Sequence, residues 1–147
     1  MYTYQKHTLD NGLRVVLIHM PYLHSVLISM FVRVGPRFES DEESGLSHFL
    51  EHVLLNGTES YPSSHDLFEA VENISGELNG LTSYEHGLYW IRVHHDYCAE
   101  GMKIFADIFN APLFDAAEIE RERQIILEEA YGYNQENLVY LLIDLLW

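Results

Sequence analysis

Two histidines and a glutamate stand close together in the segment His48-Phe49-Leu50-Glu51-His52. If residues 44 to 55 form a helix, His48, Glu51 and His52 fall on one face, because they are three and four residues apart. Neutral imidazole is a good zinc ligand, and a glutamate beside an activated water is the usual general base of a hydrolytic zinc site. The spacing therefore predicts that His48 and His52 bind zinc and that Glu51 is the catalytic base.

A catalytic zinc ion needs a further protein ligand, because such sites usually take three and leave the fourth position to water. Two adjacent glutamates on a later predicted helix, Glu128 and Glu129, are candidates for the third ligand. The residue types alone do not choose between them. A purely structural zinc site is disfavoured, because structural sites are usually closed by four cysteine or histidine ligands.

Ser47 to His52, followed by Asn56-Gly57-Thr58, resembles the motif region of the pitrilysin/insulinase family of zinc metallopeptidases, which includes the mitochondrial processing peptidases. The H-x-x-E-H order is the inverzincin signature of this family. Other stretches resemble the family in order and spacing, namely Asn11 to Val15, Gly35 to Glu39, Leu78 to Ser83 and Glu120 to Ile126. The resemblance covers nearly the whole chain and implies the N-terminal catalytic half of such an enzyme.

The resemblance also implies roles for three further residues. The family's third zinc ligand is a glutamate 76 residues beyond the second motif histidine, and 76 residues separate His52 from Glu129. Glu122 matches an acidic residue near the zinc and would support the ligands by hydrogen bonding or charge. Asn79 matches a substrate-contacting asparagine on the strand to which an extended peptide adds by backbone pairing. The alternative for Asn79 is an ordinary polar residue on an edge strand.

The composition is typical of one domain with a sizeable core, since 48% of the 147 residues are hydrophobic. Eight basic residues stand against 23 acidic ones, giving a formal charge of −15. That charge disfavours nucleic acid and anionic membranes as partners. It would attract a cationic peptide, although it is equally compatible with a role in solubility alone.

The chain is expected to be soluble and cytoplasmic. No basic region leads into an apolar run at Met1 to Lys6, as a signal peptide would require, and no run reaches the roughly 18 apolar residues of a membrane helix. The single cysteine, Cys98, excludes an intrachain disulfide and is expected in the core.

Hydrophobic periodicity predicts an α+β fold, a largely antiparallel sheet with helices packed on it. Strands are expected over 13–19, 25–34, 77–83 and 86–94, the first two as an antiparallel pair. Helices are expected over 44–55, 62–75, 96–110 and from Asp115, where Asp115 to Glu118 reads as a capping box. Side chains expected to face inward from the last two helices are Met102, Phe105, Ile108, Phe109, Ile119, Gln124 to Leu127 and Ala130.

The end of the chain, Leu138 to Trp147, has nine apolar residues in ten and no helix stop signal. A helix with so large an apolar surface needs another element to cover it. The resemblance implies that the family's fold continues past this point and that its active unit joins two homologous halves. Residues 1–147 are therefore expected to form a single but incomplete N-terminal zinc-peptidase domain, with a homologous second half or subunit as its partner.

The function predicted is that of a zinc-dependent metalloendopeptidase, which hydrolyses oligopeptides or extended protein segments. The alternative is a non-catalytic, substrate-presenting half of a two-part peptidase. Silent halves usually lose zinc ligands or the base, whereas this chain keeps all four residues, so the catalytic half is favoured. The remaining histidines are expected to be surface or capping residues rather than ligands. His86, His94 and His95 lie beside predicted strand ends, and no partners at ligand spacing are found for His7, His19, His24 and His65.

Overall fold

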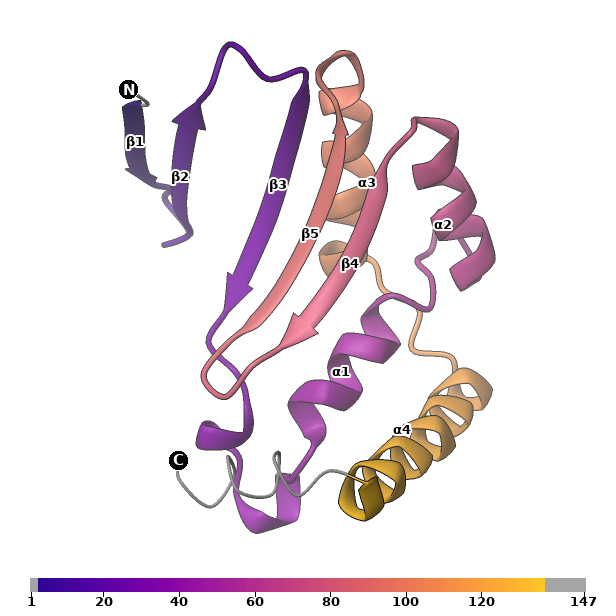
Figure 1. Ribbon diagram of the computed structural model, residues 1–147. Coiled ribbons are helices and arrows are strands. Elements are labelled where there is room, and N and C mark those ends of the chain that lie inside the picture. Colours follow the sequence, from indigo (N-terminus) through magenta and orange to yellow (C-terminus); the bar gives the residue numbers. More distant parts are fainter. Residues whose placement is uncertain (1–2, 137–147) are drawn as a thin grey trace.

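The computed structural model describes residues 3–136 and, within them, two antiparallel sheets flanked by α-helices (Figure 1). The first sheet pairs β1 (Thr3–Thr8) with β2 (Arg14–His19). The second has the order β3-β5-β4, with β5 (Gly87–His94) between β3 (Ser25–Val32) and β4 (Glu77–Thr82). The predicted α+β class, with antiparallel strands and packed helices, is confirmed.

The expected pairing of residues 13–19 with 25–34 is wrong. The turn at Asn11-Gly12 closes a hairpin between β1 and β2, with Leu13 donating its N–H to Asn11 Oδ1 and Gly12 at φ +86°. β3 pairs instead with β5. An Asn-Gly turn of this kind joins two adjacent strands. The polar sequence of β1, TYQKHT, hides its strand character.

The core lies on one face of the three-stranded sheet. Side chains of β5 alternate, so that Tyr89, Ile91 and Val93 are buried while Arg92 and His94 are exposed. Two helices, α2 (Ser64–Asn73) and α3 (Cys98–Asn110), contribute to the same cluster, and Figure 1 shows α3 behind the sheet. The members from these helices are Leu67, Val71, Ile104, Phe105 and Ile108.

One core assignment in α3 is wrong, because Met102 is 49% exposed and Ile104 takes the inward position. Phe105, Ile108 and Phe109 contact the core as expected. Cys98 is half-buried at the first position of α3 rather than within the core.

The last described helix, α4 (Ala116–Glu136), lies beside α1 (Leu46–Leu54), away from the sheet (Figure 1). Asp115 Oδ1 accepts the N–H groups of Ala117 and Glu118, so Asp115 caps the helix, which is one half of the predicted capping box. Among residues 3–136, α4 packs mainly on α1, so its covered stripe is narrow. Ile119, Glu122 and Ile126 lie on that stripe, whereas the expected inward residues Gln124, Ile125 and Leu127 are exposed.

The apolar stretch predicted to need a partner, residues 138–147, lies outside the described part of the chain. Between residues 3 and 136, no helix combines the length and the hydropathy needed to cross a bilayer.

Candidate metal centre

Helix α1 is fixed at its N-terminus by the carboxylate of Glu39. The Glu39 carboxylate accepts the N–H of Gly45 at 2.8 Å and that of Ser47 at 2.7 Å, and Gly45 sits in the left-handed region at φ +87°. Desolvation alone would raise the pKa of Glu39, but hydrogen bonds from Ser47 and Gly45 outweigh it and hold the pKa below its ordinary value. A charged carboxylate therefore caps the motif helix.

The sides of α1 are held as well. Ser47 is buried, and its Oγ accepts the N–H of Gly35 at 2.8 Å. Gly35 has φ +130°, and a Cβ at this position would lie 2.4 Å from the Ser83 carbonyl oxygen. Val53 and Leu54 are buried at the other end of α1. This packing fixes the orientation in which α1 presents its polar face.

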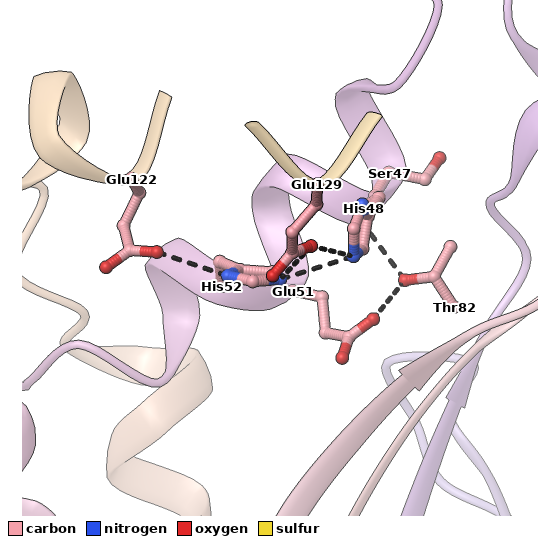
Figure 2. A network of polar contacts seen from close by, with 7 residues as sticks. All are labelled: Ser47, His48, Glu51, His52, Thr82, Glu122 and Glu129. Carbon is pink, nitrogen blue, oxygen red and sulfur yellow. Dashed lines mark hydrogen bonds and ion pairs between the residues drawn. The ribbon is translucent and has the colours of Figure 1, made fainter. Parts of the chain in front are cut away.

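That polar face carries His48, Glu51 and His52, and Glu129 of α4 reaches over it (Figure 2). His48 Nε2 lies 3.2 Å from His52 Nε2. Glu129 Oε2 lies 3.8 Å from His48 Nε2 and 3.9 Å from His52 Nε2. The structure thus brings together the three residues predicted as zinc ligands, although they are up to 81 positions apart in the sequence.

The dimensions of this group fit a zinc ion. A circle through the three facing atoms of His48, His52 and Glu129 has a radius of about 2.1 Å, close to the length of zinc–nitrogen and zinc–oxygen bonds. At a separation of 3.2 Å, the two imidazole nitrogens have room for one shared proton or for one shared cation. The Glu129 carboxylate lies beside them and adds a negatively charged oxygen ligand. Two neutral imidazoles and one carboxylate are a donor set typical of catalytic zinc.

Glu122 lies behind His52. Its Oε2 is 3.1 Å from His52 Nδ1, and its side chain is only 9% exposed. A carboxylate in this place accepts the Nδ1–H and leaves Nε2, which faces His48 and Glu129, free of a proton. The position of Glu122 is therefore that of the predicted supporting residue.

Glu51 points away from its histidine neighbours toward the sheet, where Thr82 Oγ1 donates a hydrogen bond of 2.5 Å to its Oε2 (Figure 2). The side chain crosses Gly80 so closely that a Cβ there would lie 2.8 Å from Glu51 Cγ. Burial, with a smaller contribution from the charge of Glu51, raises the pKa of Tyr89 to about 12. Tyr89 therefore stays neutral beside the carboxylate.

Asn79 is exposed on β4, and its side-chain oxygen accepts the N–H of Gly80 at 2.8 Å. β4 pairs with β5 on one side and is an edge strand of the described sheet. Glu128, the alternative third ligand, is exposed and belongs to no metal-sized group among the described residues.

Two features of the structure escaped the sequence analysis. Thr82 was seen only as part of a strand, because nothing in its sequence neighbourhood shows that Glu51 lies against it. The expectation that His24 and His65 have no partners at ligand spacing is wrong, since ligand atoms of His24, His94 and His95 lie within 4.8 Å of one another, as do those of His65, Asp66 and Glu69. His94 is a capping residue as expected, because its side chain accepts the Asp96 N–H. The adjacent pair His94-His95 was the available signal, but the approach of His24 depends on strand register.

Comparisons with known proteins show the family to which the chain belongs. The family model described as insulinase, peptidase family M16, matches residues 14–146. An uncharacterized zinc protease of Rickettsia felis is 39% identical over 88% of this chain, and the mitochondrial-processing peptidase subunit beta of Dictyostelium discoideum is 35% identical over 83%.

A solved structure is also similar. The crystal structure of a protease from Helicobacter pylori superposes on 88% of this chain with a TM-score of 0.81 and 26% identity. The chain spans 31% of that protein, 31% of the Rickettsia relative and 26% of the Dictyostelium one. Because the family model covers nearly all of the sequence, the chain belongs to the insulinase family of peptidases.

Proposed function

We propose that this chain is the zinc-binding catalytic domain of a metalloendopeptidase, with His48, His52 and Glu129 as zinc ligands and Glu51 as general base. The observation that carries the proposal is the triangle of His48 Nε2, His52 Nε2 and Glu129 Oε2, whose sides of 3.2, 3.8 and 3.9 Å suit one zinc ion. Relatives named zinc proteases support the choice of metal.

Zinc, when bound, would supply a Lewis acid that polarises the scissile carbonyl and lowers the pKa of a water. Residues of the chain would move the proton and orient the ligands. Glu51 lies on the same face of α1 as the two histidines, with one oxygen held by Thr82. It would take the proton of the attacking water and pass it to the leaving amine. Glu122 would keep His52 in the tautomer that leaves Nε2 unprotonated.

The substrate class proposed is an oligopeptide or an extended protein segment. The outer edge of β4 carries no strand in the described structure, and Glu51 lies over Gly80 of the same strand. A peptide paired with β4 would place its backbone near the catalytic group by main-chain hydrogen bonds, and Asn79 would contact it. The excess of acidic residues favours cationic peptides.

A homologous second half or subunit is proposed as partner, because the chain spans only about a third of its relatives. The alternative function is a substrate-presenting half without activity of its own. The presence of both histidines, Glu129 and Glu51 in one site favours catalysis. The two functions differ in whether a zinc-loaded chain cleaves peptide when a second half is supplied.

The proposal is tested with Glu51→Gln. The isolated chain and the chain mixed with a homologous second half are assayed on a fluorogenic peptide set, with zinc content measured in parallel. Glu51→Gln should keep its zinc and lose at least about 1,000-fold in kcat, because the base is gone while the ligands remain. Glu69→Gln, an exposed glutamate on α2, serves as the matched control and should cleave normally.

Two outcomes would contradict the proposal. Cleavage by Glu51→Gln at the rate of the unaltered chain would remove the base assignment. A zinc-loaded chain that cleaves nothing even with its second half would assign it to the substrate-presenting class.

A further inference from the structure

A second group of histidines lies at the end of the sheet that is remote from Thr82. His24 comes just before β3, His94 ends β5, and His95 follows it. One ring nitrogen from each of the three side chains lies within 4.8 Å of the others. Thr82 pairs with Gly87, and His94 lies seven positions further along the extended strand β5, a distance on the order of 20 Å.

The backbone holds these histidines together. The β3–β5 register places Ser25 opposite His94, so His24 extends that pairing by one residue, and the His95 N–H donates to the His24 carbonyl at 2.9 Å. The imidazole rings of His24 and His94 are stacked with centroids 6.4 Å apart, and those of His94 and His95 are 4.3 Å apart. Strand pairing therefore brings the three residues side by side.

Asp96 contacts two of the rings. His95 Nδ1 lies 3.1 Å from Asp96 Oδ1, and a carboxylate that accepts the Nδ1–H of an imidazole leaves Nε2 as the metal-binding nitrogen. His94 Nδ1 instead accepts the backbone N–H of Asp96 at 3.4 Å, so this nitrogen carries a lone pair. The His94 and His95 side chains are 43% and 50% exposed, so an ion can reach them from solvent.

The cluster borders an open cavity of about 530 Å³, whose walls include His24, His94, Glu77 and Arg92. Arg92 forms an ion pair with Glu77, its partner on the neighbouring strand β4. The Glu77 carboxylate therefore offsets the positive charge of Arg92 near the histidines. The cavity leaves room for the water ligands that an incompletely closed metal site keeps.

We propose that His24, His94 and His95 form a second transition-metal site, separate from the centre at His48, His52 and Glu129. Three imidazoles select Zn²⁺, Cu²⁺ or Ni²⁺ over Mg²⁺ and Ca²⁺, which prefer oxygen ligands. The bound ion would link the segment before β3 to the turn after β5 and so stabilise the folded chain. Acidification would release it, because protons compete for the imidazole nitrogens.

The test counts zinc with only this site present. In the chain carrying His48→Ala and His52→Ala, we expect about one Zn²⁺ per chain in competition with a chromophoric chelator. Adding His24→Ala, His94→Ala and His95→Ala should weaken zinc binding by at least about 100-fold. Loss of a group that merely supports a metal ligand already costs about tenfold or more, and here three ligands are removed. The matched control adds His7→Ala, His19→Ala and His86→Ala instead, which should leave binding unchanged.

A second readout follows the imidazole NMR signals during zinc titration. The signals of His24, His94 and His95 should move together, at a stoichiometry of one. Circular dichroism shows whether each variant is folded. Loss of all zinc binding in the His48→Ala/His52→Ala chain, or binding that survives the three further alanines, would overturn the proposal. Neither outcome depends on the first site, so failure here leaves the proposed peptidase function standing.

Discussion

At the scale of single residues, the orientation of Glu51 is set by two neighbours on β4. Thr82 donates a hydrogen bond to one carboxylate oxygen, and the missing side chain of Gly80 leaves space for the Glu51 methylene groups. Thr82 Oγ1 also lies 3.5 Å from the Ser47 carbonyl, so it joins α1 to the strand. Thr82 is thus a positioning residue for the proposed base.

Replacing Thr82 tests this role. Thr82→Val keeps the shape of the side chain but leaves Glu51 without its donor, so kcat should fall by about tenfold, with KM and zinc content nearly unchanged. Thr82→Ser restores the hydroxyl and should recover most of the activity. A rise in KM alone, or no rescue by serine, would assign Thr82 a merely structural part.

At the scale of elements, the candidate site depends on how α1 begins. The sequence predicted the helix and its polar face, because spacings of three and four place His48, Glu51 and His52 together. It did not predict the cap, which comes from Glu39, six and eight residues before the N–H groups it accepts. Such a loop contact leaves no periodic signal.

A pH-dependent loss of stability should follow from Glu39→Gln. The pKa of Glu39 is lowered in the folded chain, so its stabilising effect is present above the unfolded value near 4.5 and is lost as the pH falls through the folded pKa. At pH 7 the substitution should cost about 1 kcal/mol of unfolding free energy, a typical value for a cap. Urea denaturation at pH 7 and at acid pH measures the difference between the two chains. A difference that grows on acidification would contradict the assignment.

At the scale of the whole molecule, the three-stranded sheet carries the core, whereas the β1–β2 hairpin is exposed. Val16, Leu17 and Ile18 of β2 are each more than half exposed, while Tyr89, Ile91 and Val93 of β5 are buried. Sequence periodicity identified β2 and β5 alike as strands. It could not rank them, because burial depends on which helices cover which sheet.

Hydrogen exchange of the isolated chain should reflect this contrast. Amides of β1 and β2 should exchange through local opening at a cost well below the global unfolding free energy, because little packs on them. Amides of β5 should require global unfolding. Equal protection of the β1–β2 hairpin and β5 in mass spectrometry or NMR would contradict the assignment of the hairpin as the less stable sheet.

The extent of sequence-based prediction differs between the two halves of the candidate site. The α1 residues followed from spacing, whereas Glu129 and Glu122 were separated from neighbouring acidic residues only by resemblance to a family. Their approach to His52 requires α4 to pack on α1, and the helical pattern of α4 misplaced Gln124, Ile125 and Leu127. Packing partners, rather than local propensity, decided those positions.

The most direct measurement is zinc stoichiometry in the chain that carries alanine at positions 24, 94 and 95, so that only the first centre is counted. This chain should bind about one zinc. Glu129→Gln should weaken that binding by at least about tenfold, because a charged ligand is removed, whereas Glu128→Gln, its neighbour, should bind as before. A folded chain that binds no zinc, or that loses zinc equally with either substitution, would contradict the assignment of His48, His52 and Glu129 as the metal centre.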